Sequence, residues 1–279
     1  MSKIGAIFKR AGHKALITYL TVGYPSVDAT LEIVPMIASS GCDLVELGIP
    51  FSDPLADGTT IQRASYQALQ HGVTPELCLE VASKLSAKVD IPLVFMTYFN
   101  PVLSYGVKDF CKDCARAGVS GLIIPDLPPE EGTELERISP KYGLELIYLL
   151  APNSTEERID IVAARSRGFI YLVSMTGVTG SRDKLPKELE SFVSRVRQRT
   201  NQPLCVGFGI SNAEQAQRVA KIADGIIVGS RLIQLLEEKD APSKVRSFVR
   251  SLRDALDNQV EKNSRSRSTK RRPTMQQSS

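Results

Sequence analysis

Three carboxylates follow one another in residues 44–58, LVELGIPFSDPLADG. Glu46 lies inside an apolar run that is typical of a buried strand, and Asp53 and Asp57 follow in a loop broken by proline and glycine. An ionised carboxylate is costly to bury, so burial raises the pKa of such an acid toward neutral pH. An acid of this kind can both donate and accept a proton. No Lys or Arg stands near the end of an apolar run to pair with Glu46, so we interpret Glu46 as catalytic rather than structural.

Side chains alternate between the two faces of a strand, so the direction of the Glu46 side chain can be predicted. It shares a face with Leu44 and Gly48, while Val45 lies on the opposite face, which suits packing against helices. Glu46 should therefore point into the interior of the fold. Asp57 by itself is an ordinary turn residue of an Asp-Gly pair, and only its place on the same loop makes it a candidate. Two carboxylates in different surroundings can divide acid and electrostatic roles.

The elements that must position these acids alternate along the chain. Eight apolar, β-branched runs are separated by helical patterns: residues 15–23, 43–50, 92–99, 121–126, 144–152, 168–174, 203–210 and 225–230. This pattern predicts a (β/α)8 barrel, with the active site at the carboxyl ends of the strands. A doubly wound open sheet is the alternative, but few open sheets contain eight repeats. The long gap between the second and third runs has room for an extra helix, over 61–70 and then 75–88.

The chain is expected to form one catalytic domain over residues 1–258. Its last helix should bury one apolar face, made of Val245, Phe248, Val249, Leu252 and Leu256. Residues 259–279 form a basic tail too poor in apolar residues to build a core, so we expect it to be disordered. Without this tail the chain is close to neutral, and we expect no nucleic-acid partner. A tail that contacts RNA or an anionic surface is the alternative.

Composition excludes several classes of protein. No apolar run approaches the roughly 20 residues of a membrane helix, and the N-terminus has no secretory signal, so we expect a cytoplasmic protein. The five cysteines suit free thiols in a reducing compartment. Cys111 and Cys114 could be half of a zinc site, but they read as one face of a helix that ends at Gly118, and no second pair stands at ligand spacing. Neither His13 nor His71 ends a strand, so we predict no metal site and no catalytic histidine.

Glycines follow the last runs of the chain. Gly207 and Gly209 end one run and open a helix, and Gly229 and Ser230 do the same after the next. Glycine lets main-chain N–H groups approach a ligand, and helix N-termini favour anions. In barrels of this type the last two loops are the usual phosphate site, so we predict that a phosphate binds here.

Five motifs along the chain, taken in order, resemble those of one known family. ELGIPFSDPLADG, IIPDLP, TGVTG, GFGIS and GIIVGS together resemble the α subunit of tryptophan synthase, from about residue 15 to the last helix. The resemblance implies a carbon–carbon lyase of L-tryptophan biosynthesis that cleaves indole-3-glycerol phosphate, by a retro-aldol reaction, to indole and D-glyceraldehyde 3-phosphate. It implies no cofactor in this subunit. The implied partner is a β subunit that depends on pyridoxal phosphate (PLP) and receives indole within an α2β2 heterotetramer.

The resemblance also implies roles for individual residues. It puts the catalytic acids at Glu46 and Asp57. The implied substrate-binding residues are Tyr19, Tyr98, Ile123 and Tyr171 around indole, Gly180, Gly207, Phe208, Gly209, Gly229 and Ser230 around phosphate, and Thr179 on a lid that braces Asp57. Asp53 and Pro54 would face the β subunit. Thr59 departs from the proline that many members have after the Asp-Gly pair.

Three other functions are alternatives, and the sequence does not separate the first of them from a β-dependent subunit. A standalone lyase that releases free indole would carry the same catalytic acids. A barrel enzyme acting on another phosphorylated sugar would share the phosphate loops without the aromatic pocket. A barrel without catalytic activity could serve as a binding module whose basic tail contacts nucleic acid.

Overall fold

The strands form a nearly closed parallel barrel. The computed structural model describes residues 2–173, 188–207 and 209–269, with side chains up to residue 258. The strands are β1 (Ala15–Thr21), β2 (Leu44–Gly48), β3 (Leu93–Met96), β4 (Val119–Ile123), β5 (Glu145–Ile147), β6 (Leu149–Leu150), β7 (Ile170–Val173), β8 (Leu204–Gly207) and β9 (Gly225–Val228). They pair in the order β5-β4-β3-β2-β1-β9-β8-β7-β6, and every pair is parallel. Because β5 and β6 are consecutive in the chain, the two ends of this sheet meet, and the predicted (β/α)8 barrel is confirmed.

The fifth predicted run is divided into two strands. Tyr148 separates β5 from β6, and its N–H bonds to the hydroxyl of Ser166 at 3.1 Å instead of a neighbouring strand. Its carbonyl still accepts from Tyr171 N at 3.1 Å. This side-chain hydrogen bond replaces a ladder bond, which is why eight predicted runs give nine strands.

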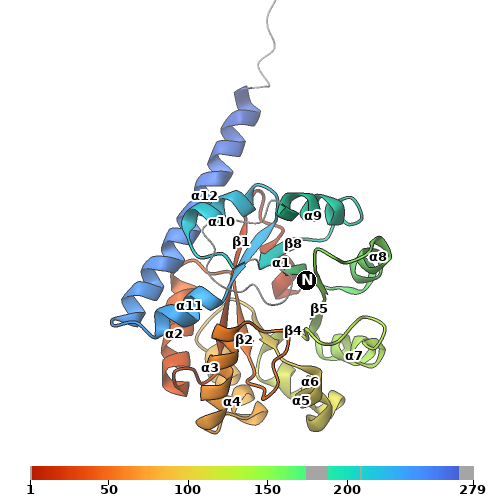
Figure 1. Cartoon of the computed structure of the whole chain (residues 1–279), viewed down its shortest axis with the longest axis vertical. Helices are drawn as coiled ribbons and strands as arrows, with labels where there is room; N and C mark the ends of the chain where they lie inside the picture. The colour runs from red at the N-terminus through yellow and green to blue at the C-terminus, as the bar shows by residue number, and fades with distance from the viewer. Residues whose placement is uncertain (1, 174–187, 208, 270–279) are drawn as a thin grey trace, which may run out of the picture.

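Helices surround the barrel (Figure 1). They are α1 (Lys3–Ile7), α2 (Val27–Ser39), α3 (Thr59–Gln70), α4 (Pro75–Ser86), α5 (Phe99–Tyr105), α6 (Val107–Arg116), α7 (Thr133–Ile138), the 3-10 turn η1 (Ser139–Tyr142), α8 (Glu156–Arg165), α9 (Glu188–Arg197), α10 (Ala213–Ala220), α11 (Ser230–Leu236) and α12 (Ala241–Thr269). The predicted extra helix between the second and third strands is confirmed by α3 and α4. Helix α3 lies beside α11, and α12 packs along α2, α10 and α11 before it extends beyond the barrel (Figure 1).

The core has two layers. The barrel interior is filled by inward side chains such as Leu44, Val94 and Ile227, and α1 adds Ile4 and Ile7 at the end where the strands begin. A larger cluster lies between the outer faces of the strands and the helices. Inward residues alternate with outward ones along each strand, which is the pattern expected of a packed barrel.

The last helix follows its prediction as far as the structure describes it. Val245, Val249, Leu252 and Leu256 are fully buried, and Phe248 is partly buried against the same cluster. The helix continues through Thr269, past the predicted start of the tail at residue 259, and residues 270–279 lie outside the described residues. The division of the chain at residue 258 stays a prediction. Within the described residues, no helix combines the length and apolar character that a membrane span requires.

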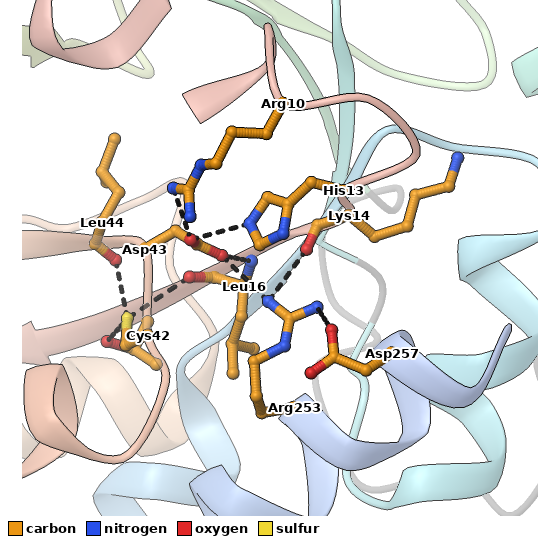
Figure 2. Close-up of polar contacts among 10 residues, drawn as sticks. Arg10, His13, Lys14, Leu16, Cys42, Asp43, Leu44, Arg253 and Asp257 are labelled. Carbon is orange, nitrogen blue, oxygen red and sulfur yellow. Dashed lines mark hydrogen bonds and ion pairs between the residues drawn. The ribbon is translucent and has the colours of Figure 1, made fainter. Parts of the chain in front are cut away.

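A buried carboxylate ties the segment before β1 and the last helix to the start of the barrel (Figure 2). Asp43, just before β2, accepts hydrogen bonds from Arg10 at 2.9 Å and from Leu16 N at 2.9 Å, and its carboxylate lies 2.8 Å from His13 Nε2. Arg253 of α12 donates to the same carboxylate at 3.0 Å. Burial by itself would raise the pKa of Asp43, but the hydrogen bonds and the nearby positive charge outweigh burial and lower it.

We expect Asp43→Ala to destabilise the chain by about 3 kcal/mol, because removing one partner of a buried ion pair leaves the other uncompensated. Since the pKa of Asp43 is lowered on folding, its stabilising effect is complete above its ordinary value of 3.8 and is lost as the pH falls through the lower folded value. Urea unfolding at pH 7 and at acidic pH measures both effects. Asp90→Ala, at an exposed position, is the control, and equal stabilities of the two variants would contradict the prediction.

Candidate active site

Glu46 is a fully buried acid. It lies in β2 next to Tyr19 of β1 and Val94 of β3 in the strand register. Its residue exposure is 0%, and neither carboxyl oxygen has a hydrogen-bond partner among the residues that the structure describes. Burial raises its pKa from 4.5 to about 8. Leu44 on the same face belongs to the interior cluster, whereas Val45 packs outward, so the predicted inward direction of Glu46 is confirmed.

Two tyrosine rings lie near Glu46, at places where glycine leaves room. A Cβ atom at Gly48 would lie 2.1 Å from the Tyr19 hydroxyl, and one at Gly207 would lie 2.6 Å from the ring of Tyr171. Burial raises the pKa of both tyrosines, and the charge of Glu46 contributes to each shift. The predicted phosphate residue Gly207 therefore has a packing role as well, because any side chain there would displace the Tyr171 ring.

Asp57 lies on the loop after β2 and is held by Tyr98. The Tyr98 hydroxyl donates to Asp57 Oδ2 at 3.1 Å and accepts from Ala56 N at 2.9 Å. Burial raises the pKa of Asp57 from 3.8 to about 6, and the hydrogen bond from Tyr98 acts in the opposite direction. At neutral pH these values leave Asp57 mainly ionised and Glu46 mainly protonated. The two acids thus differ in charge, as an acid and an electrostatic partner should.

A hollow opens between the last two loops. Its lining includes Gly209, Ser211, Gly229 and Ser230, together with Tyr19 and Tyr171 at its inner side. Gly209 has a φ of +66°, a conformation that favours glycine. Helix α11 begins after Gly229, which has no side chain to act as a cap, and no side chain among the described residues caps its first N–H groups. Main-chain donors at such a helix start can bind an anion.

A second hollow, of about 430 Å³, contains Asp57. Its lining also includes Leu127, and Ile61, Met96 and Tyr171 line both hollows. The carboxylate of Asp57 and the glycine loops therefore share one opening at the carboxyl ends of the strands. A ligand with an apolar ring and an anionic end would fit this arrangement.

Some predicted residues lie elsewhere. Glu46, Tyr98, Gly207 and Ile123 line neither hollow, and Ile123 is fully buried in the interior cluster. Thr179, Gly180 and Phe208 lie outside the described residues. Asp53 is exposed and Pro54 is half-buried at the tip of the loop after β2.

Sequence reasoning missed two residues that line both hollows. Met96 continues the inward face of β3 two residues after Val94, so strand alternation could have identified it. Ile61 comes from the first turn of α3, and no sequence signal distinguishes it from a helix core residue.

Both cysteines of the CxxC pair lie in the core. Cys111 and Cys114 are both fully buried on α6, which ends just before Gly118. Within the described part of the chain, no group of three or more His, Cys, Asp and Glu side chains could hold a metal ion. His13 belongs to the Asp43 cluster, and His71 ends α3 at an exposed position.

A parallel barrel is typical of (β/α)8-barrel enzymes when it has a buried acid with no partner among the described residues and a hollow between glycine loops at the carboxyl ends of its strands. Within that class the comparisons are specific, because the sequence model of the tryptophan synthase alpha chain family matches residues 6–262. The chain belongs to the tryptophan synthase alpha chain family, and the resemblance noted in the sequence is confirmed.

Individual relatives agree with this assignment. The tryptophan synthase alpha chain of Dehalococcoides mccartyi is 58% identical over 257 residues, which cover 92% of this chain and all of the relative. That of a Roseiflexus species is 48% identical over 260 residues, covering 91% of this chain and all of the relative. Among solved structures, Mycobacterium tuberculosis tryptophan synthase has a TM-score of 0.86 at 39% identity and covers 91% of this chain and 98% of its own. The alpha subunit from Legionella pneumophila has a TM-score of 0.86 at 35% identity, covering 92% and 99%.

Proposed function

We propose that the chain cleaves indole-3-glycerol phosphate to indole and D-glyceraldehyde 3-phosphate, as a carbon–carbon lyase of tryptophan biosynthesis. The observation that carries the proposal is Glu46, a buried acid that retains its proton near neutral pH and has no hydrogen-bond partner within the described structure. An acid kept in that state is suited to donate a proton to a carbon atom and to take one back. Family membership favours this activity over another sugar-phosphate reaction and over a binding module without catalysis.

The proposed reaction uses the two acids in sequence. Glu46 gives its proton to C3 of the indole ring, and positive charge grows on the ring nitrogen. Asp57, as a carboxylate, accepts a hydrogen bond from the ring N–H and stabilises that charge. The ionised Glu46 then removes the proton of the hydroxyl on the carbon attached to C3. The bond between that carbon and C3 breaks, its electron pair neutralises the ring, and an aldehyde and indole are released.

The two hollows match the two ends of the proposed substrate. The indole ring would lie where the two hollows adjoin, against Tyr171 and Met96, which line both, and beside Tyr19, which lines the first. The phosphate would bind the main-chain N–H groups at Gly229 and Ser230, with Gly180 and Phe208 of the predicted set in the part of the chain that is not described. Both proton transfers need only carboxyl groups, so the proposal includes no cofactor in this subunit.

The proposed partner is a PLP-dependent β subunit in an α2β2 complex. The loop after β2 offers a surface for it, because Asp53 is exposed and the side chain of Leu55 is 86% exposed. Burial of this apolar side chain against another protein would remove apolar surface from water, which is favourable. A standalone lyase is not favoured, because the relatives described above are tryptophan synthase alpha chains.

Indole release from indole-3-glycerol phosphate, measured with and without added β subunit, tests the proposal. We expect slow release by the isolated chain and strong stimulation by the partner. No indole under either condition would contradict the proposed reaction. Equal rates with and without the partner would contradict the proposed dependence on the β subunit while leaving the chemistry in place.

A further inference from the structure

Two side chains of helix α3 hold the loop that carries Asp57. Near the start of the loop, the Ser65 hydroxyl accepts from Phe51 N at 2.9 Å and donates to Phe51 O at 3.1 Å. At the other end, Gln62 Nε2 donates to the carbonyl of Asp57 at 2.9 Å, with a longer contact of 3.4 Å to the carbonyl of Pro54. The helix itself is anchored, because Ser65 is buried on its inner face together with neighbouring alanines.

Gln62 joins the two ends of a tight turn. Asp57 N donates to the carbonyl of Pro54 at 3.0 Å, which closes the turn over residues 54–57. The Gln62 side chain folds back from the first turn of α3 and donates to the carbonyls of Asp57 and, at the longer distance, Pro54. Main-chain Gln62 N bonds to Gly58 O at 2.9 Å, so the side chain starts from a fixed helical position.

The turn therefore has a support on each side of Asp57. Gln62 holds the Asp57 main chain from α3, and Tyr98 holds its carboxyl group from the start of α5. Between these supports, Leu55 at the tip of the turn is exposed to solvent. If the hydrogen bond from Gln62 is lost, the main chain at Asp57 is free to shift. The hydrogen bond between its carboxyl group and the Tyr98 hydroxyl then no longer keeps one fixed geometry.

We propose that Gln62 is a positioning residue that fixes Asp57 through its main-chain carbonyl and links its placement to the exposed tip of the loop. This inference rests on the proposed function for its catalytic consequence. It also extends that function, because one amide group contacts both the loop segment proposed to face the partner and the proposed catalytic acid. If a bound partner displaces Pro54, the Gln62 amide would move with it and change the position of Asp57.

Gln62→Met tests the proposal, because methionine has a similar length but no hydrogen to donate. In the isolated chain we expect kcat for indole release to fall about 10-fold to 100-fold, since small displacements of a catalytic group cost about that much. KM should change less than about threefold, because substrate binding does not depend on the Asp57 carboxyl to the same degree. The factor by which the β subunit stimulates kcat should also fall. Gln67→Met, at an exposed position on the same helix, should behave like the wild type.

A second readout does not depend on activity. The pKa of the Asp57 carboxyl, followed by carbon NMR, should rise in Gln62→Met, because the hydrogen bond from Tyr98 lowers it in the wild type. Gln62→Leu, which also has no hydrogen to donate and adds no charge near Asp57, replaces Gln62→Met if that variant does not fold.

The outcomes separate this inference from the proposed function. A folded variant with unchanged kcat and unchanged Asp57 pKa would overturn the positioning role, while the wild type still releases indole. An unchanged stimulation factor with a lowered kcat would overturn the link to the partner. An inactive wild type would contradict the proposed reaction, and the NMR titration would still decide whether Gln62 positions Asp57.

Discussion

Glu46→Gln is expected to lower kcat for indole release by about a hundredfold to ten-thousandfold, which is the usual effect of general acid–base catalysis. The amide has the shape of the acid but cannot give a proton to C3 or remove one from the hydroxyl. Substrate binding should persist, because the proposed phosphate site at Gly229 and Ser230 is unchanged. Steady-state kinetics and binding of a glycerol phosphate analogue measure the two effects. Near-native turnover would refute the role of Glu46, and Glu80→Gln, at an exposed position, is the matched control.

The same substitution should stabilise the fold. An acid whose pKa is raised by folding, here from 4.5 to about 8, keeps its proton in the folded state while the unfolded chain releases it. The stability of the wild type therefore falls as the pH rises between these two values. At pH 7 the loss amounts to about 3 kcal/mol, since each pKa unit corresponds to roughly 1.4 kcal/mol. In urea unfolding from pH 5 to pH 8, the free energy of unfolding of Glu46→Gln should increase relative to that of the wild type as the pH rises.

Asp57→Asn is expected to lower kcat about a hundredfold to a thousandfold, because a neutral amide does not stabilise the positive charge on the ring nitrogen as a carboxylate does. Asp90→Asn, at an exposed position, should leave kcat unchanged. Comparable activity in the two variants would remove Asp57 from the mechanism.

The pH dependence of kcat/KM distinguishes the two acids. Asp57 must be ionised, so activity should fall as the pH falls through about 6, and Glu46 must be protonated, so activity should fall as the pH rises through about 8. Asp57→Asn should lose the acidic limb of this profile and keep the alkaline limb. A wild-type profile without an alkaline limb would contradict the proposed protonation state of Glu46.

The sequence by itself determined the barrel and the direction of Glu46. Both depend on local patterns, namely apolar runs that alternate with helical periodicity and side chains that alternate across a strand. The glycine loops could also be read from the sequence, because glycine after a strand has few other uses than a turn or a close main-chain approach. The family was recognisable from the order of its motifs along the chain.

Asp57 shows what local sequence patterns do not determine. Turn chemistry alone made it an ordinary turn residue, and its place on the loop after Glu46 made it a candidate. The role that the resemblance assigns to it stays a prediction. Its contact with Tyr98, 41 residues away, depends on how β2 and β3 lie side by side. No pattern in the intervening residues specifies that distance.

The tertiary structure alone decided the contacts between distant residues. Arg253 meets Asp43 across 210 residues because barrel closure brings α12 to the start of β2. Gln62 lies only five residues from Asp57, yet its bond to that carbonyl depends on how the loop folds back over α3. Strand and helix periods fix the direction of a side chain within an element. The placement of loops and of distant elements depends on the packing of the whole barrel, so these contacts could not be derived from sequence spacing.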